Sequence, residues 1–334
     1  MNEQTYFSFL QQTFHYFSRP HEGVPVAPIA SPADWRGADL AEDKNWRVIF
    51  SADEIGEIKM ALAHAKATGK ELGDMAKEDF PLPGLSENIH RWRREILSGR
   101  GFQVISGLPI SEWSESDAEI FFWCFGLHLG RPGAQNQHDQ LLGHVRDTGA
   151  DAEDPFVRQY MTAQNIPFHC DAADVVGLFC VNKAKSGGQS RIASSVGAFN
   201  TLLEQRPELA SLLFEPLMLD TRQEDGVTGA KCAPIPPCQY GGGVLRTFYH
   251  SEYFRTAQRH EGVRLSPQQN ELLDSYDAIL DAPGYYLDMD LEPGDIQLLS
   301  NHVIVHARTD YEDYPEPDRK RHLLRLWLSI EDEQ

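Results

Sequence analysis

The residues best suited to chemistry are a histidine and an aspartate two positions apart, His169 and Asp171. On an extended backbone alternate side chains point to the same side, so an imidazole nitrogen and a carboxylate oxygen would lie together. These are two of the three donors of the facial triad that holds non-haem Fe(II) and leaves coordination positions open. With 13 His and 50 Asp+Glu in 334 residues, roughly two His-x-acid pairs arise by chance. The surroundings must therefore distinguish a site from a coincidence.

The two His-x-acid pairs in the chain have different surroundings. His169 and Asp171 precede an apolar run, 175–181, which is typical of a buried strand. The pair His250 and Glu252 instead begins a stretch that resembles a solvent-facing helical turn. We therefore expect the first pair, at the edge of a rigid sheet, to bind metal and the second pair not to bind it.

A facial triad needs one more nitrogen, and the block from Ser300 to Thr309 contains two candidates, His302 and His306. Four residues separate them, so on a strand both side chains would occupy the same face. The alternation of side chains along a strand therefore does not distinguish them, and either histidine could supply the third ligand.

Two arginines follow on a strand expected at 321–329. Arg321 and Arg325 share one face of this strand, and leucines occupy the other face. An arginine on an apolar core strand is costly unless it pairs with an anion. The pattern indicates anionic ligands beside the metal; the alternative is pairing with some of the many Asp and Glu side chains of the chain itself.

Composition narrows the class of partner. The chain has 30 Lys+Arg against 50 Asp+Glu, a net charge of −20, which argues against nucleic acid or an anionic membrane and favours a small-molecule substrate. Five cysteines without a Cys-x-x-Cys pair indicate a reducing compartment. The start of the chain lacks a signal-peptide pattern, and no apolar run approaches the roughly 20 residues of a membrane helix. We expect a cytoplasmic protein, and a homo-oligomer is left open.

The apolar periodicity and turn residues predict a mainly β fold with helices. Helices are expected at 51–68, 86–97, 114–129, 195–205, 207–214 and 266–280. Strands are expected at 102–106, 156–162, 175–181, 285–289, 296–299, 303–306 and 321–329. A hairpin is expected at 238–250. Closely spaced late strands favour antiparallel pairing in a jelly-roll double sheet. We expect one structural unit, in which 1–98 form an N-terminal arm and helical layer, and 99–334 form the core with a mixed insertion at about 196–283. The arm is expected to pack on the main body; a lid over the site is the alternative.

These motifs, taken together, resemble those of the taurine dioxygenase-like (TauD/TfdA-like) Fe(II)/2-oxoglutarate-dependent oxygenases. Blocks like those of the family occur in the same order at 99–102, 129–132, 168–178, 186–190, 293–295, 301–309 and 321–328. The resemblance implies a double-stranded β-helix (jelly-roll) core.

The resemblance also implies roles for individual residues. It assigns iron to His169, Asp171 and His306. It assigns the distal carboxylate of 2-oxoglutarate to Ser190 and Arg321. Arg325 then faces the primary substrate or shares that carboxylate. Three further side chains are candidate substrate contacts: Asn165, Tyr160 and Gln137.

The implied activity uses Fe(II), 2-oxoglutarate and O2 to oxidise a C–H bond of a small, anionic or amino-acid-like substrate, releasing succinate and CO2. Asp171 is a carboxylate rather than the small residue that halogenating relatives need, which favours hydroxylation. Desaturation or oxidative cyclisation with the same cofactors is one alternative. An alternative of another class is a non-catalytic jelly-roll module that binds a small anion through Arg321 and Arg325.

Overall fold

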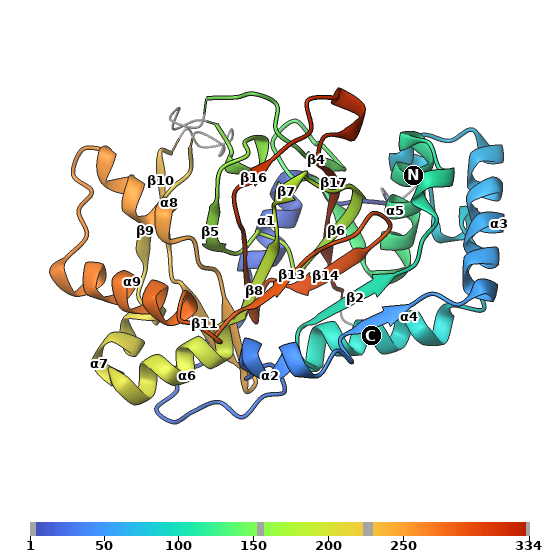
Figure 1. Cartoon of the computed structure of the whole chain (residues 1–334). Coiled ribbons are helices and arrows are strands. Elements are labelled where there is room, and N and C mark those ends of the chain that lie inside the picture. The colour runs from blue at the N-terminus through green and yellow to red at the C-terminus, as the bar shows by residue number, and fades with distance from the viewer. Residues whose placement is uncertain (1–4, 152–156, 223–229, 332–334) are drawn as a thin grey trace.

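The computed structural model describes residues 5–151, 157–222 and 230–331, and two antiparallel sheets occupy its centre (Figure 1). The larger sheet has the order β1-β2-β14-β6-β17-β3, and β4 also pairs with β17; the smaller sheet has the order β13-β8-β15-β5. Within the described ranges the ladders of both sheets are antiparallel, except for the parallel pair β1–β2. The predicted antiparallel double sheet is thus confirmed in its main pairing.

The bounds of the strands are as follows. The larger sheet contains β1 (Arg47–Ile49), β2 (Phe102–Ser106), β3 (Arg131–Gly133), β4 (Gly143–Val145), β6 (Val175–Asn182), β14 (Ile296–Ser300) and β17 (His322–Ser329). The smaller sheet contains β5 (Ile166–His169), β8 (Ser190–Ser194), β13 (Leu287–Met289) and β15 (Ile304–Arg308). Three short pairs complete the set: β7 (Ser186–Gly187) with β16 (Tyr311–Glu312), β9 (Leu217–Asp220) with β10 (Cys232–Ile235), and β11 (Cys238–Gly241) with β12 (Val244–Thr247).

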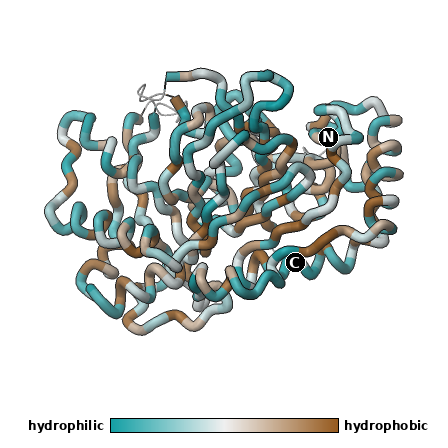
Figure 2. The backbone as a smooth tube through the Cα atoms, in the orientation of Figure 1, coloured by the Kyte–Doolittle hydropathy of each residue, from teal (hydrophilic) through white to brown (hydrophobic). Residues whose placement is uncertain are grey.

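Helices cover both sheets. They are α1 (Phe9–Phe17), α2 (Gly37–Glu42), α3 (Ala52–Thr68), α4 (Ser86–Ser98), α5 (Glu115–Leu129), α6 (Ser195–Gln205), α7 (Pro207–Ala210), α8 (Ser251–Thr256) and α9 (Pro267–Leu280). Helices α3, α4 and α5 share one hydrophobic core with the larger sheet, and α6, α7 and α9 share another with the smaller sheet. Apolar residues accordingly concentrate along the central strands (Figure 2). Among the described residues, none of the helices combines the length and apolar character needed to cross a membrane.

Local sequence signals explain where the long helices begin. Ser51, Ser114 and Ser266 each cap a helix through a capping box, and Pro267 follows as the first helical residue of α9. These starts confirm the predictions. The expected strand at 156–162 is wrong for its described part, because Gln159–Met161 form a short 3-10 turn; Phe156 lies outside the described residues. The alternation there reflects a polar loop that borders a cavity rather than a sheet face.

The contact between α5 and β17 depends on Gly126, which leaves room for Leu326. A Cβ atom at position 126 would lie 2.2 Å from Cδ2 of Leu326. We expect Gly126→Ala to lower the free energy of unfolding by about 1–3 kcal/mol, as overpacked core substitutions do. The measurement is urea denaturation. As a control, Gly56→Ala in α3 meets nothing within 4 Å and should stabilise the protein by up to about 1 kcal/mol. Equal midpoints for the two variants would contradict this account.

Candidate active site

Three candidate metal ligands meet where two strands of the smaller sheet pair. His169 at the end of β5 lies directly opposite His306 of β15 in the antiparallel register. One donor atom from each of His169, Asp171 and His306 lies within 4.8 Å of the other two. The two imidazole rings are 4.2 Å apart between centroids, and His306 Nε2 is 3.9 Å from Asp171 Oδ2. The sequence-predicted group is therefore brought together in space.

His302, the other candidate for the third nitrogen, lies outside this group. It occupies the turn before β15, which begins only at Ile304, so strand parity does not apply to it. Its Nε2 atom is 2.7 Å from Asp174 Oδ1, and its ring stacks on Tyr16 at 4.8 Å. His302 therefore helps to hold the N-terminal helix rather than facing Asp171.

Hydrogen bonds orient the donor atoms. His169 Nδ1 is 2.9 Å from the carbonyl oxygen of Pro167, so Nδ1 carries the proton and Nε2 keeps its lone pair. The indole N–H of Trp327 donates to Asp171 Oδ2 at 3.1 Å, and Arg325 Nη1 donates to the same oxygen at 3.3 Å. The backbone N–H of Asp171 donates to Asn301 Oδ1 at 3.2 Å. The carboxylate is thus held in one position before any metal arrives.

The electrostatics keep these donors unprotonated at neutral pH. Burial acts to raise the pKa of Asp171, but Arg325 and the two imidazoles outweigh it and hold the pKa well below its usual range. Burial lowers the pKa of His306 to about 3, and His169 acts in the same direction. Burial also lowers the pKa of His169. A carboxylate anion and two neutral imidazoles are the forms that bind Fe(II) or another divalent metal.

A cationic pocket lies beside the end of β15, the strand that carries His306. Arg308 is two residues further along β15, so its side chain leaves the sheet on the side of His306, and its backbone pairs with Ser190 of β8. Both Arg308 and Arg321, which precedes β17, lie over the ring of Tyr311, with centroid distances of 4.8 and 5.0 Å. Ser190 Oγ donates to Gln297 Oε1 at 2.9 Å. We call Ser190, Arg308, Arg321 and Tyr311 the cationic pocket.

The guanidinium groups of the cationic pocket are only partly hydrogen-bonded: Arg308 Nη2 donates to the carbonyl oxygens of Thr162, at 2.8 Å, and of Gln164. Arg308 Nε and Nη1 and Arg321 Nη1 are buried and have no hydrogen-bond acceptor among the described residues. Burial lowers the pKa of Arg308 to about 10, and the nearby Arg321 adds to the effect. Buried donors without acceptors are costly, so the pocket has the charge and hydrogen-bonding character of an anion site. Arg308 was not among the sequence candidates, although the alternation His306-Ala-Arg308 already placed it on the ligand side.

Of the three candidate substrate contacts, only one borders the site. Tyr160 borders the site, with Arg325 over its ring at 4.8 Å. Asn165 and Gln137 are exposed and do not line the cavity. Instead Gln135 contacts the site: its Oε1 accepts from Arg325 Nε at 2.8 Å, and its Nε2 donates to the Arg325 carbonyl oxygen at 2.7 Å.

The expectation that His250 starts a solvent-facing turn is wrong. His250 forms an antiparallel bridge with His169, their rings are 5.3 Å apart, and Tyr253 stacks on His250 at 3.6 Å. Burial, with the positive neighbours, lowers the pKa of His250 well below its usual value. Helix α8 lies against β5 and β9, so Phe254 faces the core. His250 therefore borders the metal ligands without joining their donor group.

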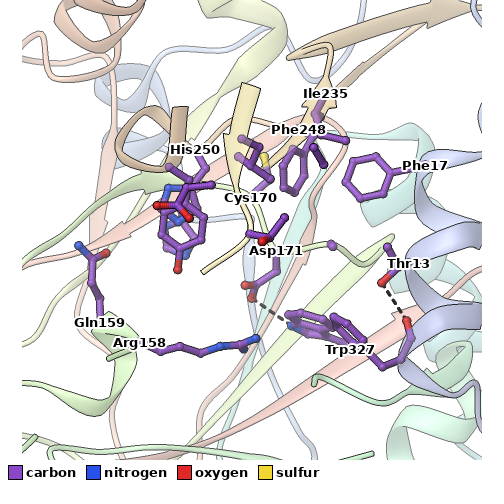
Figure 3. Close-up of a pocket in the computed structure, with 18 of the residues that line it drawn as sticks. Thr13, Phe17, Arg158, Gln159, Cys170, Asp171, Ile235, Phe248, His250 and Trp327 are labelled. Carbon is purple, nitrogen blue, oxygen red and sulfur yellow. Dashed lines mark hydrogen bonds between the residues drawn. The ribbon is translucent and has the colours of Figure 1, made fainter. Parts of the chain in front are cut away.

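A cavity of about 410 Å³ opens beside Asp171 (Figure 3). Its lining includes His169, His250 and Arg325, the loop Gln159–Tyr160, and several apolar side chains from the N-terminal helix and β10. Most of the lining surface is apolar. The cavity gives a small molecule access to the position between the three candidate ligands.

A second donor group joins the exposed Glu115, the first residue of α5, to the half-buried His144 and the buried His322. His144 Nδ1 and His322 Nε2 are 2.9 Å apart and the rings stack at 5.1 Å, so the two imidazoles satisfy each other. None of these three residues lines the cavity.

Comparison with curated proteins identifies relatives over nearly the whole chain. The FR-33289 synthase of Streptomyces rubellomurinus is 29% identical over 317 residues, covering 91% of this chain and 91% of that protein. The taurine hydroxylase-like protein SAT17 of Stachybotrys chartarum is 27% identical over 311 residues, covering 90% of this chain and 79% of that protein. A uridine-5'-phosphate dioxygenase of an Amycolatopsis species is 29% identical over 244 residues, covering 67% of this chain and 83% of that protein.

Solved structures share the fold. An asparagine oxygenase in complex with Fe(II), hydroxyasparagine and succinate superposes with a TM-score of 0.68 at 18% identity, covering 85% of this chain and 94% of that one. The non-haem iron oxygenase OrfP in complex with Fe and alpha-ketoglutaric acid gives a TM-score of 0.63 at 16% identity, with the same coverage of 85% and 94%. The model of the taurine catabolism dioxygenase TauD, TfdA family matches residues 66–327. The chain therefore belongs to the TauD/TfdA family and is an Fe(II)/2-oxoglutarate-dependent oxygenase.

Proposed function

We propose that this oxygenase hydroxylates a C–H bond of a small substrate that carries an anionic or amino-acid-like group. In this proposal His169, Asp171 and His306 hold Fe(II), and Ser190, Arg308 and Arg321 hold the distal carboxylate of 2-oxoglutarate. The observation that supports it best is the combination of two features: three donor atoms within 4.8 Å of one another, and buried guanidinium N–H groups without acceptors on Arg308, two residues beyond His306, and on Arg321. We also propose that the two sheets form a double-stranded β-helix that works as a single unit from 99 to 334.

The residues fit the implied cofactors on chemical grounds. Two imidazoles and one carboxylate leave coordination positions free for the keto and carboxylate oxygens of 2-oxoglutarate and for O2. When bound, iron and 2-oxoglutarate supply the oxidation: substrate C–H, 2-oxoglutarate and O2 become substrate C–OH, succinate and CO2. The anion site two residues beyond His306 would then accept the far end of the cosubstrate and satisfy the buried guanidinium donors.

Arg325 has a different role from Arg321 in this proposal. Its guanidinium already donates to Asp171 and to Gln135, so most of its donors are used within the protein. We assign Arg325 to hold the Asp171 carboxylate and to present positive charge to the substrate cavity, which it lines. Arg321, which has a buried N–H without an acceptor, is the better partner for 2-oxoglutarate.

Hydroxylation is preferred to the alternatives on the following grounds. Asp171 supplies a carboxylate ligand, which leaves no position for the halide that halogenation requires. Desaturation and cyclisation use the same site and differ only in how the substrate is placed. A non-catalytic anion-binding module does not account for a complete donor set in a member of an oxygenase family.

The ligand assignment predicts which histidine is needed for iron. We expect His169→Ala and Asp171→Ala each to abolish the weak visible charge-transfer band that forms when Fe(II) and 2-oxoglutarate are added without oxygen, because a donor is lost in each variant. The control is His302→Gln, which can still hydrogen-bond to Asp174 and should keep the band. Loss of the band in His302→Gln, with retention in His306→Ala, would move the third nitrogen to His302.

The cationic pocket predicts the binding of 2-oxoglutarate. We expect Arg321→Ala and Arg308→Gln to raise the dissociation constant for 2-oxoglutarate about 10- to 100-fold, since hydrogen bonds to charged groups contribute about 1.5–3 kcal/mol. Anaerobic titration of the charge-transfer band measures this. Arg191→Gln is the matched control, because Arg191 lies beside Ser190 but pairs with Asp288 near the surface. An unchanged dissociation constant in Arg321→Ala would transfer that role to Arg325.

The reaction type predicts the product. With an accepted substrate, we expect one succinate for each product molecule and a mass gain of about 16 units, one oxygen atom. Mass spectrometry of the product and coupled succinate detection make the measurement. A mass loss of about two units would indicate desaturation or cyclisation instead of hydroxylation.

A further inference from the structure

The donor group Glu115, His144 and His322 comes from three elements that pack on one another. His144 lies in β4 opposite Leu324 of β17, two residues from His322, which begins that strand. Glu115 is the first residue of α5, and α5 packs against β17 (Figure 1). A helix and two paired strands therefore hold the three side chains, and such elements fix the spacing of donor atoms more closely than loops do.

The spacing of the donor atoms suits a shared ion. Two ligands that each lie about 2.0–2.2 Å from one ion are roughly 2.8–3.6 Å apart when the angle between them is near 90–110°. His144 Nδ1 is 2.9 Å from His322 Nε2 and 3.7 Å from Glu115 Oε1. The second distance is too long for a hydrogen bond. A small rotation of the Glu115 side chain, which is 55% exposed, would bring its oxygen into the range of ligands of one ion.

Glu119 supplies the outer partner that a metal-bound imidazole usually has. It is four residues after Glu115 in α5, so the two carboxylates share one face of the helix. Its Oε1 is 3.6 Å from Nε2 of His144, whereas Nδ1 of the same ring faces His322. A carboxylate beside Nε2 favours the tautomer with its proton there, which leaves the Nδ1 lone pair for an ion.

Charge and exposure also suit a cation. Glu115 and Glu119 bring two carboxylates to the group, while Arg146 brings one positive charge to the neighbourhood of His322. The local balance is therefore negative, as is the net charge of the chain. The His144 side chain is 26% exposed, so an ion can reach the donor atoms from solvent.

We propose that Glu115, His144 and His322 form a second divalent-metal site, which binds a zinc-type ion independently of the candidate iron site. Two imidazoles and one carboxylate, with water as a fourth ligand, are a donor set typical of Zn²⁺. The ion would take the place of the proton that the two imidazoles share. This site uses no residue of the cavity lining and goes beyond the proposed function. The ion would join α5 to the start of β17 and stabilise the folded chain, because it binds the folded state.

Counting bound zinc ions tests the second site. Zn²⁺ alone is equilibrated with EDTA-treated, dialysed full-length protein at about pH 7.5, where ordinary histidines are mostly neutral. Bound metal is measured by equilibrium dialysis at about 10 µM free Zn²⁺. Since Zn²⁺ also suits the His169 group, we expect two ions per unmodified chain and one per chain in Asp171→Ala. Adding His144→Ala to Asp171→Ala should remove that remaining ion.

The effect of His144→Ala decides the inference. Loss of one zinc ion when His144→Ala is added supports it, and an unchanged zinc content overturns it. The candidate iron site is tested separately by the same measurement: equal zinc content in Asp171→Ala and the unmodified protein would count against that site alone. The two failures are therefore distinguishable.

Variants of exposed and half-buried carboxylates guard against a loss of folding. Glu115→Gln removes a ligand without touching the core and should weaken Zn²⁺ binding in Asp171→Ala at least tenfold. Glu119→Gln should weaken it about tenfold, as the loss of an outer partner does. His138→Ala is the control, because His138 is exposed in the loop before β4 and lies outside the donor group. Equal zinc affinity in Glu115→Gln and His138→Ala would contradict the site.

Discussion

The antiparallel pairing of β5 with β15 is the constraint on which the rest of the site depends. It places His169 opposite His306, although 137 positions separate them in the chain (306 − 169). Asp171, just beyond the end of β5, completes the donor group because Trp327 and Arg325 of β17 hold its carboxylate from the larger sheet. Since two of the candidate ligands belong to hydrogen-bonded strands and the third follows one of them directly, the sheets set their spacing.

Buried charge is the second feature that links the two sheets. Asp171 is compensated within the protein by Arg325, whereas Arg308 and Arg321 have donors that no described residue satisfies. A folded chain tolerates such groups at a cost, and a bound anion removes that cost. Under the proposed function, this contrast between Arg325 and the partly unsatisfied Arg308 and Arg321 separates a supporting residue from two that bind a ligand.

The N-terminal helix extends the site beyond the sheets. It shares Asp174 with the turn that carries His302, so the side of the cavity and the ligand-bearing strands are parts of one hydrogen-bonded assembly. The cavity that this helix borders has a mostly apolar lining.

The amino-acid sequence alone was sufficient to predict the candidate donor pair His169 and Asp171, the main helices with their serine caps, and the arginines of the last strand. These features depend on local spacing and periodicity. The sequence was not sufficient to choose His306 over His302, since that choice depends on where β15 begins. Nor could it place His250 beside His169, bring Gln135 into contact with Arg325, or bring α1 to the cavity. Those relations join residues far apart in the chain, and strand register and packing between elements, which no short window contains, determine them.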